Sequence, residues 1–460
     1  MKLELDHLDA TGALEAFRDG SVTPAEYAEA IADRALEHSG LNALQSFSPE
    51  YLVQAATEAF QAIPKALLSG LPVVAKDNIN TTNYPTSGGT QALLDHTPAN
   101  NADVVKRITN AGGFIGAKAG MHELAFGITS NNAVAGAVRN PNNPSMIPGG
   151  SSGGTAAAIA AGIFPVGLGT DTGGSCRIPA SLCGVVGFRP TTGRYDSEGI
   201  VPISHTRDTV GPLARSVRDI ALFDGVLSGD ISTIANANIS DFTIGVPRQV
   251  FFDNLDPIVA HAVEAQLLSL SSQGAKLVEV SLDPIWPHNE AFSFPVVFYE
   301  VMRDLPAYLS KHAPNITFEA LIAQIRSPDV AGAIGSQLGD DAMPEAVYRD
   351  AMDNHRPEMR RIYGGVFEDH GLEAIVFPTT PLTARPIGGD ETVELNGAQV
   401  PTFPTYIRNT DLGSNVGAPG ISLPCPITSG LPVGIEFDAL PGKDRSLLAL
   451  AGAAEKAIAQ

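Results

Sequence analysis

The sequence predicts an α/β fold in which helices cover both faces of a β-sheet. Helical segments alternate with short apolar strands through residues 70–212, a pattern typical of such a sheet. The chain has 460 residues, of which 44% are hydrophobic and 17% are charged, so it can bury a large core. No linker rich in proline and serine, charge block or internal repeat divides the sequence. We therefore expect a single domain over residues 1–460.

The first part of the chain has helices and strands with recognisable limits. Much of residues 9–36 has helical periodicity, and Thr23-Pro24-Ala25-Glu26 predicts a capping box with proline in the first turn. The apolar run at 70–75 predicts a strand. Residues 101–111 predict a helix with one apolar side, and 114–118 predict the strand that follows it.

Residues 242–370 are less uniform in pattern. The expected elements are strands at 242–247 and 277–280, a helix at 258–270 and an amphipathic helix at 295–309. The last helix carries Phe298, Tyr299, Met302 and Leu305 at helical spacing, and such a stripe usually packs in a core. We therefore expect these four side chains to lie away from any substrate. The chain then returns to the sheet at 374–377.

Two glycine-rich turns, at 149–154 and 172–175, carry serines and bracket an alanine-rich segment. Glycine permits sharp bends, so such loops can direct several backbone N–H groups at one phosphate or oxyanion. Neither turn is followed by the lysine of a Walker loop, and the third glycine of a dinucleotide fingerprint is missing after Gly167. The G-x-S-x-G elbow of α/β-hydrolases is absent at Ser175 as well. The pattern favours a serine nucleophile that uses a base other than histidine.

Lys76 is the candidate base, because it follows the apolar run at 70–75. An ordinary lysine has a pKa of about 10.4 and is protonated at neutral pH. Burial at the end of a strand would lower that pKa by several units and let the amine accept a proton. The alternative is a lysine that ends a strand with its ammonium in solvent.

Together these motifs resemble the amidase signature family. The lysine of GLPVVAKDN is Lys76, the first serine of GGSSGG is Ser151, and the serine of DTGGS is Ser175. Ser151 lies 24 residues before Ser175, and Lys76 lies 99 residues before it, as in the family. The likeness continues at 189–191, 377–381 and 430–434, so it covers nearly the whole chain.

The resemblance implies an amidase signature fold, with a central mixed β-sheet covered by helices on both faces. Residues 70–215 would be the signature core, and about 242–370 would shape the substrate entrance. The implied catalytic residues are Lys76, Ser151 after a cis peptide bond, and the nucleophile Ser175. Thr172, Gly173 and Gly174 would bind the oxyanion with Ser175, while Ser152, Asp171 and Arg177 would support the loop and Phe126 would line the pocket.

Substrate is less closely defined by the motifs. Segments 121–130 and 407–415 resemble the indoleacetamide and mandelamide hydrolase branch, which implies conversion of a small arylacetamide to a carboxylic acid and ammonia. The alternatives are a broad aryl-amide or carbamate hydrolase, and the ammonia-producing A subunit of glutamyl-tRNA amidotransferase. A binding module that has lost catalysis is disfavoured, because all three triad positions are intact.

Composition and the remaining motifs argue against several partners. The net charge of −21, without any cluster of Lys and Arg, disfavours nucleic acid. No apolar run is long enough to predict a membrane span, and residues 1–6 lack the features of a secretory signal. The sparse Cys176, Cys183 and Cys425 favour reduced thiols and a cytoplasmic location.

We expect neither a metal nor a cofactor. His122 and Glu123 could suggest a metal site, but Phe126 stands where H-E-x-x-H needs its second histidine. Cys176, beside Ser175, lacks a motif histidine and is a weaker candidate nucleophile. The expected partner is a small-molecule amide, and a homodimer is possible.

Overall fold

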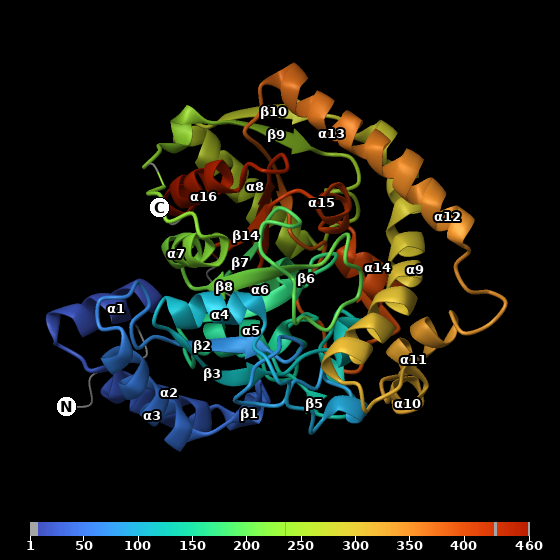
Figure 1. Cartoon of the computed structure of the whole chain (residues 1–460). Coiled ribbons are helices and arrows are strands. Elements are labelled where there is room, and N and C mark those ends of the chain that lie inside the picture. The colour runs from blue at the N-terminus through green and yellow to red at the C-terminus, as the bar shows by residue number, and fades with distance from the viewer. Residues whose placement is uncertain (1–7, 235, 427–429, 459–460) are drawn as a thin grey trace.

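An eleven-stranded mixed sheet runs through the structure, a computed structural model that describes residues 8–234, 236–426 and 430–458 (Figure 1). Its strand order is β1-β3-β2-β6-β8-β7-β14-β15-β11-β9-β10. The strands are β1 Leu44–Phe47, β2 Pro72–Lys76, β3 Phe114–Ala119, β6 Val166–Asp171, β7 Val186–Arg189, β8 Thr209–Ala214, β9 Thr243–Pro247, β10 Lys276–Val280, β11 Ala374–Pro378, β14 Gly420–Pro424 and β15 Gly434–Asp438. The predicted α/β class and mixed sheet are confirmed.

Parallel and antiparallel pairs alternate in blocks across this sheet. β2 is parallel to both β3 and β6, and β9 is parallel to both β10 and β11. The strands between these blocks pair antiparallel. Two small hairpins lie outside the sheet, formed by β4 Asn131–Asn132 with β5 Gly136–Ala137 and by β12 Thr392–Leu395 with β13 Ala398–Pro401.

Sixteen α-helices surround the sheet in the described part of the chain. They are α1 Ala10–Asp19, α2 Pro24–Glu37, α3 Pro49–Ala62, α4 Asp103–Asn110, α5 Gly153–Ala160, α6 Arg177–Cys183, α7 Val217–Ser228, α8 Pro257–Ser272, α9 Trp286–His312, α10 Phe318–Ile322, α11 Pro328–Gly335, α12 Glu345–Asp350, α13 Arg356–His370, α14 Thr402–Ile407, α15 Asp411–Val416 and α16 Asp444–Ile458. The predicted capping box is present, since Thr23 Oγ1 accepts from Glu26 N and Glu26 Oε2 accepts from Thr23 N.

Glycines of the sheet lie beneath the helices that follow the two glycine-rich turns. Glycines let α5 and α6 approach one face closely, because a Cβ at Gly167 would lie 2.6 Å from Thr155 Cγ2 and one at Gly187 would lie 2.5 Å from Ala180 Cβ. The large apolar side chains of β14 and β15 belong to one buried cluster with residues of α5, α6 and α16. The helices that carry the glycine-rich turns therefore lie against a face of small residues.

Two sequence predictions need correction in the second half of the chain. The helix predicted at 295–309 is part of the longer α9, which contains both Pro295 and Pro306. Its stripe does not face one environment, because Leu305 is buried in a core cluster whereas Phe298 lines a pocket. The expectation that Phe298 lies away from a ligand site was wrong.

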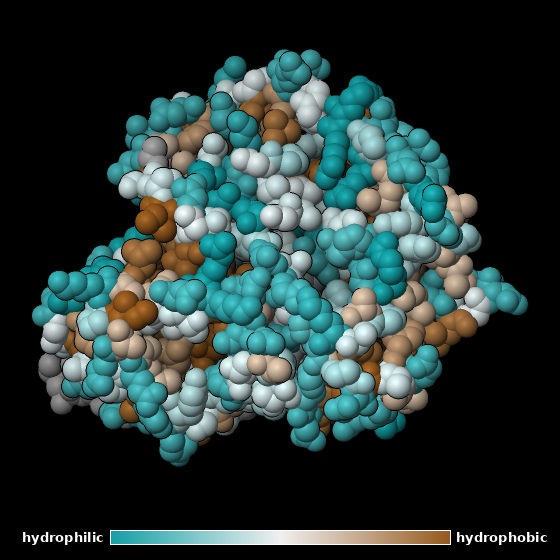
Figure 2. All heavy atoms as spheres, in the orientation of Figure 1, coloured by the Kyte–Doolittle hydropathy of each residue, from teal (hydrophilic) through white to brown (hydrophobic). Residues whose placement is uncertain are grey.

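The surface is mostly hydrophilic on the face shown in Figure 2, and it is hollowed and apolar beside α7. Leu67, Leu222, Ile231 and Ile234 line a shallow groove on that helix. No helix among the described residues is long and apolar enough to cross a membrane. Residues 1–6, in which the sequence shows no secretory signal, lie outside the described part of the chain.

Candidate active site

The candidate site lies where β2 and β6 end. These strands are parallel neighbours, with Val74 opposite Gly167 and Ala75 opposite Leu168, so their carboxyl ends meet at one edge of the sheet. Ligand sites of open α/β sheets are usually found outside the carboxyl ends of parallel strands. Lys76 is the last residue of β2, and the loop that carries Ser175 follows β6 directly.

Lys76 is fully buried beside two hydroxyl groups. Its Nζ lies 2.8 Å from Ser151 Oγ and 2.8 Å from Thr170 Oγ1. Burial lowers the pKa of the Lys76 amine to about 7, although the negative charges of Asp171 and Asp208 act in the opposite direction. At neutral pH a large share of this amine is therefore unprotonated and able to accept a proton.

Ser151 and Ser152 begin the turn before α5, and the peptide bond between Gly150 and Ser151 is cis. The side chain of Ser152 bridges to β6: its Oγ donates to Thr170 O at 3.1 Å and accepts from Thr170 N at 3.2 Å. Its backbone N donates to Ser175 O at 3.2 Å. The two glycine-rich turns are thus joined directly.

The loop from Asp171 to Gly174 has all four of its carbonyls fixed. The donor–acceptor pairs are Arg189 Nη1 to Asp171 O, Arg207 Nε to Thr172 O, Thr410 Oγ1 to Gly173 O and Ile178 N to Gly174 O. The N–H groups of Gly173, Gly174 and Ser175 donate to no other residue of the described chain. Gly174 has a φ of 144°, which favours glycine, and a Cβ there would lie 2.2 Å from Thr410 Oγ1.

The expected pair of Asp171 and Arg177 is present and belongs to a larger buried network. Arg177 Nη2 lies 3.1 Å from Asp171 Oδ1, and its Nη1 lies 2.5 Å from Glu436 Oε1. Arg189 Nη1 lies 3.0 Å from the same Asp171 oxygen. Burial alone would raise the pKa of Asp171, but the two guanidinium groups outweigh it and hold that pKa below its ordinary value. The network fixes both ends of the Ser175 loop.

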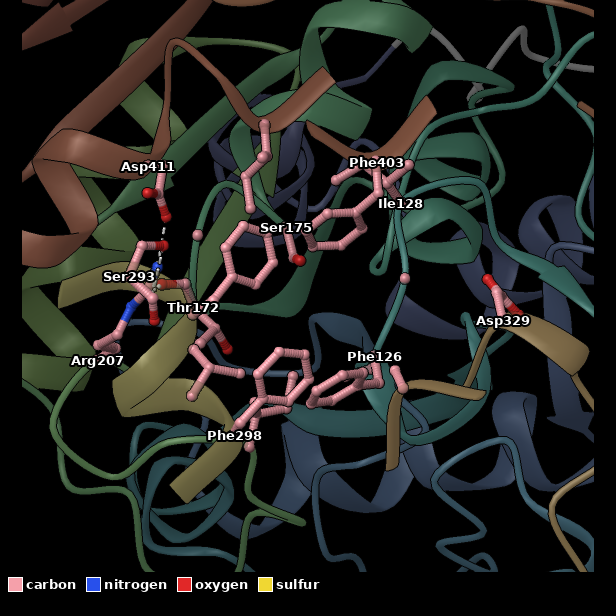
Figure 3. Close-up of a pocket in the computed structure, with 18 of the residues that line it drawn as sticks. Phe126, Ile128, Thr172, Ser175, Arg207, Ser293, Phe298, Asp329, Phe403 and Asp411 are labelled. Carbon is pink, nitrogen blue, oxygen red and sulfur yellow. Dashed lines mark hydrogen bonds and ion pairs between the residues drawn. The ribbon is translucent and has the colours of Figure 1, made fainter. Parts of the chain in front are cut away.

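Ser175 opens onto a pocket with aromatic walls (Figure 3). Its hydroxyl points into the space between Phe126, Phe298 and Phe403. Ring centroids are 6.1 Å apart for Phe126 and Phe298, and 5.9 Å apart for Phe294 and Phe298. The other apolar walls are Ile128, Ile203, Val297 and Ile407. A flat apolar group of a ligand would fill this space beside Ser175.

Polar groups occupy two separate sides of the same pocket. Arg207 lies with Asp411 and Ser293 on one side, and Asp329 lies on the other (Figure 3). Arg207 Nη2 is 2.6 Å from Asp411 Oδ1, and Nη1 is 3.0 Å from Ser293 O. Asp390 also lines the pocket. Each of the three nitrogens of the Arg207 head group thus already donates to a residue of the protein.

The serines, the lysine and the loop that the sequence singled out lie close together in the structure, but much of the pocket was not predicted. Phe126 was expected and is present, whereas the walls formed by Phe294 and Phe298 of α9 and Phe403 of α14 were not. Ile407 and Asp411 lie in the segment that resembled the arylacetamide branch, so that segment carried a usable signal. Nothing in the sequence singled out Arg207.

One cluster of side chains has the composition of a metal site. Within the described ranges, His205, Glu300 and Asp304 bring three ligand atoms within 4.8 Å of one another. Arg303 Nη2 lies 2.6 Å from His205 Nδ1 and 3.1 Å from Glu300 Oε1, so a guanidinium already occupies that place. Glu300 instead accepts from Ser204 Oγ and helps to hold the 203–208 loop against α9.

His122 and Cys176, the alternative candidates from the sequence, are both buried. His122 is buried, and its Nε2 lies 3.0 Å from Asp329 Oδ2. Cys176 is buried behind Ser175, and burial raises the pKa of its thiol to about 12. A thiol in that environment is a poor nucleophile, because the reactive thiolate is scarce at neutral pH.

Comparison with solved structures defines the class of protein. A crystal structure described as that of an amidase is 34% identical with a TM-score of 0.87, and the match covers 98% of this chain and all of that one. The peptide amidase of Stenotrophomonas maltophilia is 27% identical with a TM-score of 0.81, over 98% of this chain and 97% of that one. These likenesses show that the protein is an amide hydrolase with an α/β fold.

Sequence relatives then identify the family. A family model described as Amidase matches residues 26–448. The indoleacetamide hydrolase of Rhizobium radiobacter is 46% identical over 392 residues, which is 85% of this chain and 84% of the relative. The mandelamide hydrolase of Pseudomonas putida is 38% identical over 96% of this chain and 90% of the relative. The chain belongs to the Amidase family.

Proposed function

We propose that the protein hydrolyses a small arylacetamide to a carboxylic acid and ammonia through an acyl-enzyme on Ser175. The observation that carries this proposal is the aromatic pocket into which Ser175 opens, with a buried lysine of pKa about 7 held 2.8 Å from Ser151. Indoleacetamide and mandelamide, named for the relatives, are both small amides with an aromatic ring. Ser175 would be the nucleophile, Ser151 the relay and Lys76 the base.

In the first half of the reaction, neutral Lys76 accepts the Ser151 proton while Ser151 accepts the Ser175 proton. The Ser175 oxygen attacks the amide carbon, and the carbonyl oxygen becomes an oxyanion. Free N–H groups of Gly173, Gly174 and Ser175 stabilise that charge, together with Thr172, at about 3 kcal/mol for each donor. The C–N bond then breaks as the proton returns through Ser151 to the nitrogen, and ammonia leaves.

In the second half, water attacks the ester carbon of the acyl-enzyme. The Ser151–Lys76 pair accepts the water proton, the same oxyanion forms, and the bond to Ser175 Oγ breaks. Ser175 regains its proton from the relay, which leaves Lys76 neutral for the next cycle. The carboxylic acid product ionises and leaves the pocket. Neither half needs a group other than this chain, the amide and water.

The pocket supports an aryl amide over glutamine as substrate. Glutamine carries an α-carboxylate, and a site for it needs a cation with free hydrogen-bond capacity. Among the residues that line the pocket, Arg207 is the cationic one, and Asp411, Ser293 and Thr172 already engage it. This favours the arylacetamide proposal over the amidotransferase subunit.

The test is a product assay on indole-3-acetamide, mandelamide, phenylacetamide, an anilide, an aryl carbamate and glutamine. Ser175→Ala should lose turnover on every substrate with little change in stability. The matched control is Ser181→Ala on α6, because Ser181 Oγ is buried without a partner among the described residues and should be dispensable.

Each outcome of this panel assigns the function differently. Turnover of the three arylacetamides alone supports the proposal. Faster release of amine from the anilide or the carbamate would indicate the broader hydrolase. Turnover of glutamine alone would indicate the amidotransferase subunit, and a Ser175→Ala variant with undiminished rate would remove Ser175 from the mechanism.

A further inference from the structure

The side of the pocket opposite Arg207 is acidic. Asp329, near the start of α11, and Asp390, before β12, both line the aromatic pocket, and both also line a polar cavity that adjoins it. Glu391 contributes to that adjoining cavity, and neither lysine nor arginine is among its lining residues in the described chain. The aromatic pocket beside Ser175 thus continues into a space with excess negative charge.

Both carboxylates are fixed by the segment that forms the aromatic wall. Asp390 Oδ1 accepts from Thr129 Oγ1 and Oδ2 accepts from Asn131 Nδ2, each at 2.6 Å. Asp329 Oδ2 lies 3.0 Å from the Nε2 of buried His122, which belongs to the same stretch of chain. Burial acts to raise the pKa of Asp329, but the contact with His122 and hydrogen bonds from backbone N–H groups together lower that pKa. Both carboxylates therefore line the pocket as side chains held in place by neighbouring residues.

The opposite side of the pocket does not offset this charge. Arg207 Nη2 and Asp411 Oδ1 form an ion pair at 2.6 Å, so the two charges largely cancel. A substrate whose amide carbonyl reaches Ser175 directs its acyl group away from the catalytic loop. A substituent at the far end of that group would approach Asp329 and Asp390, where opposite charge is attracted and like charge repelled.

Resting on the proposed function, we propose that Asp329 and Asp390 select substrates by the charge of the acyl group. Aryl amides with a neutral or cationic far end are accepted, and those that carry a carboxylate are rejected. The same charge favours departure of the product, because hydrolysis of a neutral amide creates a carboxylate inside the pocket. The two aspartates are thus specificity-determining residues and take no part in the proton transfers.

Three phenylacetamides of similar shape test this proposal: 4-(aminomethyl), 4-(hydroxymethyl) and 4-carboxy. Near neutral pH and at low salt we expect kcat/KM to fall in that order, by about tenfold at each step. Asp329→Asn and Asp390→Asn should each reduce the differences in kcat/KM among the three amides. The double variant should bring the three kcat/KM values within about threefold of one another. Added salt should compress the wild-type series as well.

Neutral substrate and a remote variant provide the controls. The hydroxymethyl amide reports the integrity of the site, so the kcat/KM of each charged amide is expressed relative to that of the hydroxymethyl amide in every variant. This ratio separates a loss of charge selection from a general disturbance of the site, such as a change at Thr129 and Asn131 in Asp390→Asn. Asp340→Asn, an exposed carboxylate outside both cavities, should leave the charge series unchanged. Equal rates for the three charges in the wild type would overturn the selection proposal while leaving the amide hydrolysis intact. Loss of turnover on all neutral arylacetamides would instead overturn the proposed function.

Discussion

The pH dependence of kcat/KM is the most direct test of Lys76 as the base. With a pKa of about 7, the neutral fraction of the amine rises from about one tenth at pH 6 to about nine tenths at pH 8. We therefore expect kcat/KM for a neutral arylacetamide to rise about tenfold over that interval and then to level off. A lysine with an ordinary pKa would still gain tenfold per pH unit above pH 8.

Protonation of a second group near the site could also lower kcat/KM toward pH 6, in the acidic limb of the pH profile. Burial raises the pKa of Asp208 to about 6, and this carboxylate accepts a hydrogen bond from Thr172 Oγ1 at 2.5 Å. Its protonation would weaken the support of the oxyanion loop. Asp208→Asn separates the two causes, because a limb that belongs to Lys76 persists in the variant. The limb should also move to lower pH, since the Asp208 charge raises the pKa of Lys76.

The assay is the initial rate of ammonia release at subsaturating substrate across this pH range, in wild type and Asp208→Asn. Circular dichroism at each pH excludes unfolding as the cause of a change in rate. A plateau already reached at pH 6, or a limb that disappears in Asp208→Asn, would refute the assignment of the limb to Lys76. A rate that continues to climb steadily beyond pH 9 would mean that the burial effect on the lysine is absent.

Three substitutions test the surrounding structure. Lys76→Met should lose activity without a fall in the free energy of unfolding. The lysine amine binds a proton up to pH 10.5 in the unfolded chain but only to about pH 7 in the folded protein, so its burial costs on the order of 4 kcal/mol at neutral pH. A clear destabilisation of this variant in urea would contradict that reasoning. Arg177→Met should lower the free energy of unfolding by about 3 kcal/mol or more, because Asp171 and Glu436 lose their buried cation. The same substitution of an exposed arginine should change that free energy little. Phe298→Ala should lower kcat/KM for phenylacetamide about tenfold relative to an aliphatic amide, and equal losses for both would exclude an aromatic contact.

The local elements were predictable because their signals are local. The capping box of Thr23 and Glu26 and the strand that ends at Lys76 depend on neighbouring residues, and both occur where the sequence indicates. The strand order could not be predicted in this way, because it depends on distant residues: β14 pairs with β7 across more than two hundred residues. Sequence periodicity shows that a strand is buried but does not show which strand lies beside it.

The sequence indicated the candidate reacting groups of the site more readily than the walls of its pocket. Serine and lysine at fixed separations are rare patterns, whereas an apolar stripe is common to a core and to an aromatic pocket. On α9 the same periodicity places Leu305 in a core at 1% exposure and leaves Phe294 44% exposed at the pocket. Only the packing of α14 and the 203–208 loop against that helix makes the difference, and those contacts join distant parts of the chain.

The buried arginines beneath the Ser175 loop connect this packing to the proposed chemistry. Burying a guanidinium is costly, and a well-packed apolar group would often be as stable. An apolar side chain could not hold a carbonyl, however, whereas Arg189 and Arg207 hold those of Asp171 and Thr172. Fixing the carbonyls on one side of the loop leaves the N–H groups of Gly173 to Ser175 directed to the other, and donors that need no reorganisation stabilise a developing oxyanion most strongly. The charge network is therefore best explained by the orientation of the loop rather than by the stability of the fold.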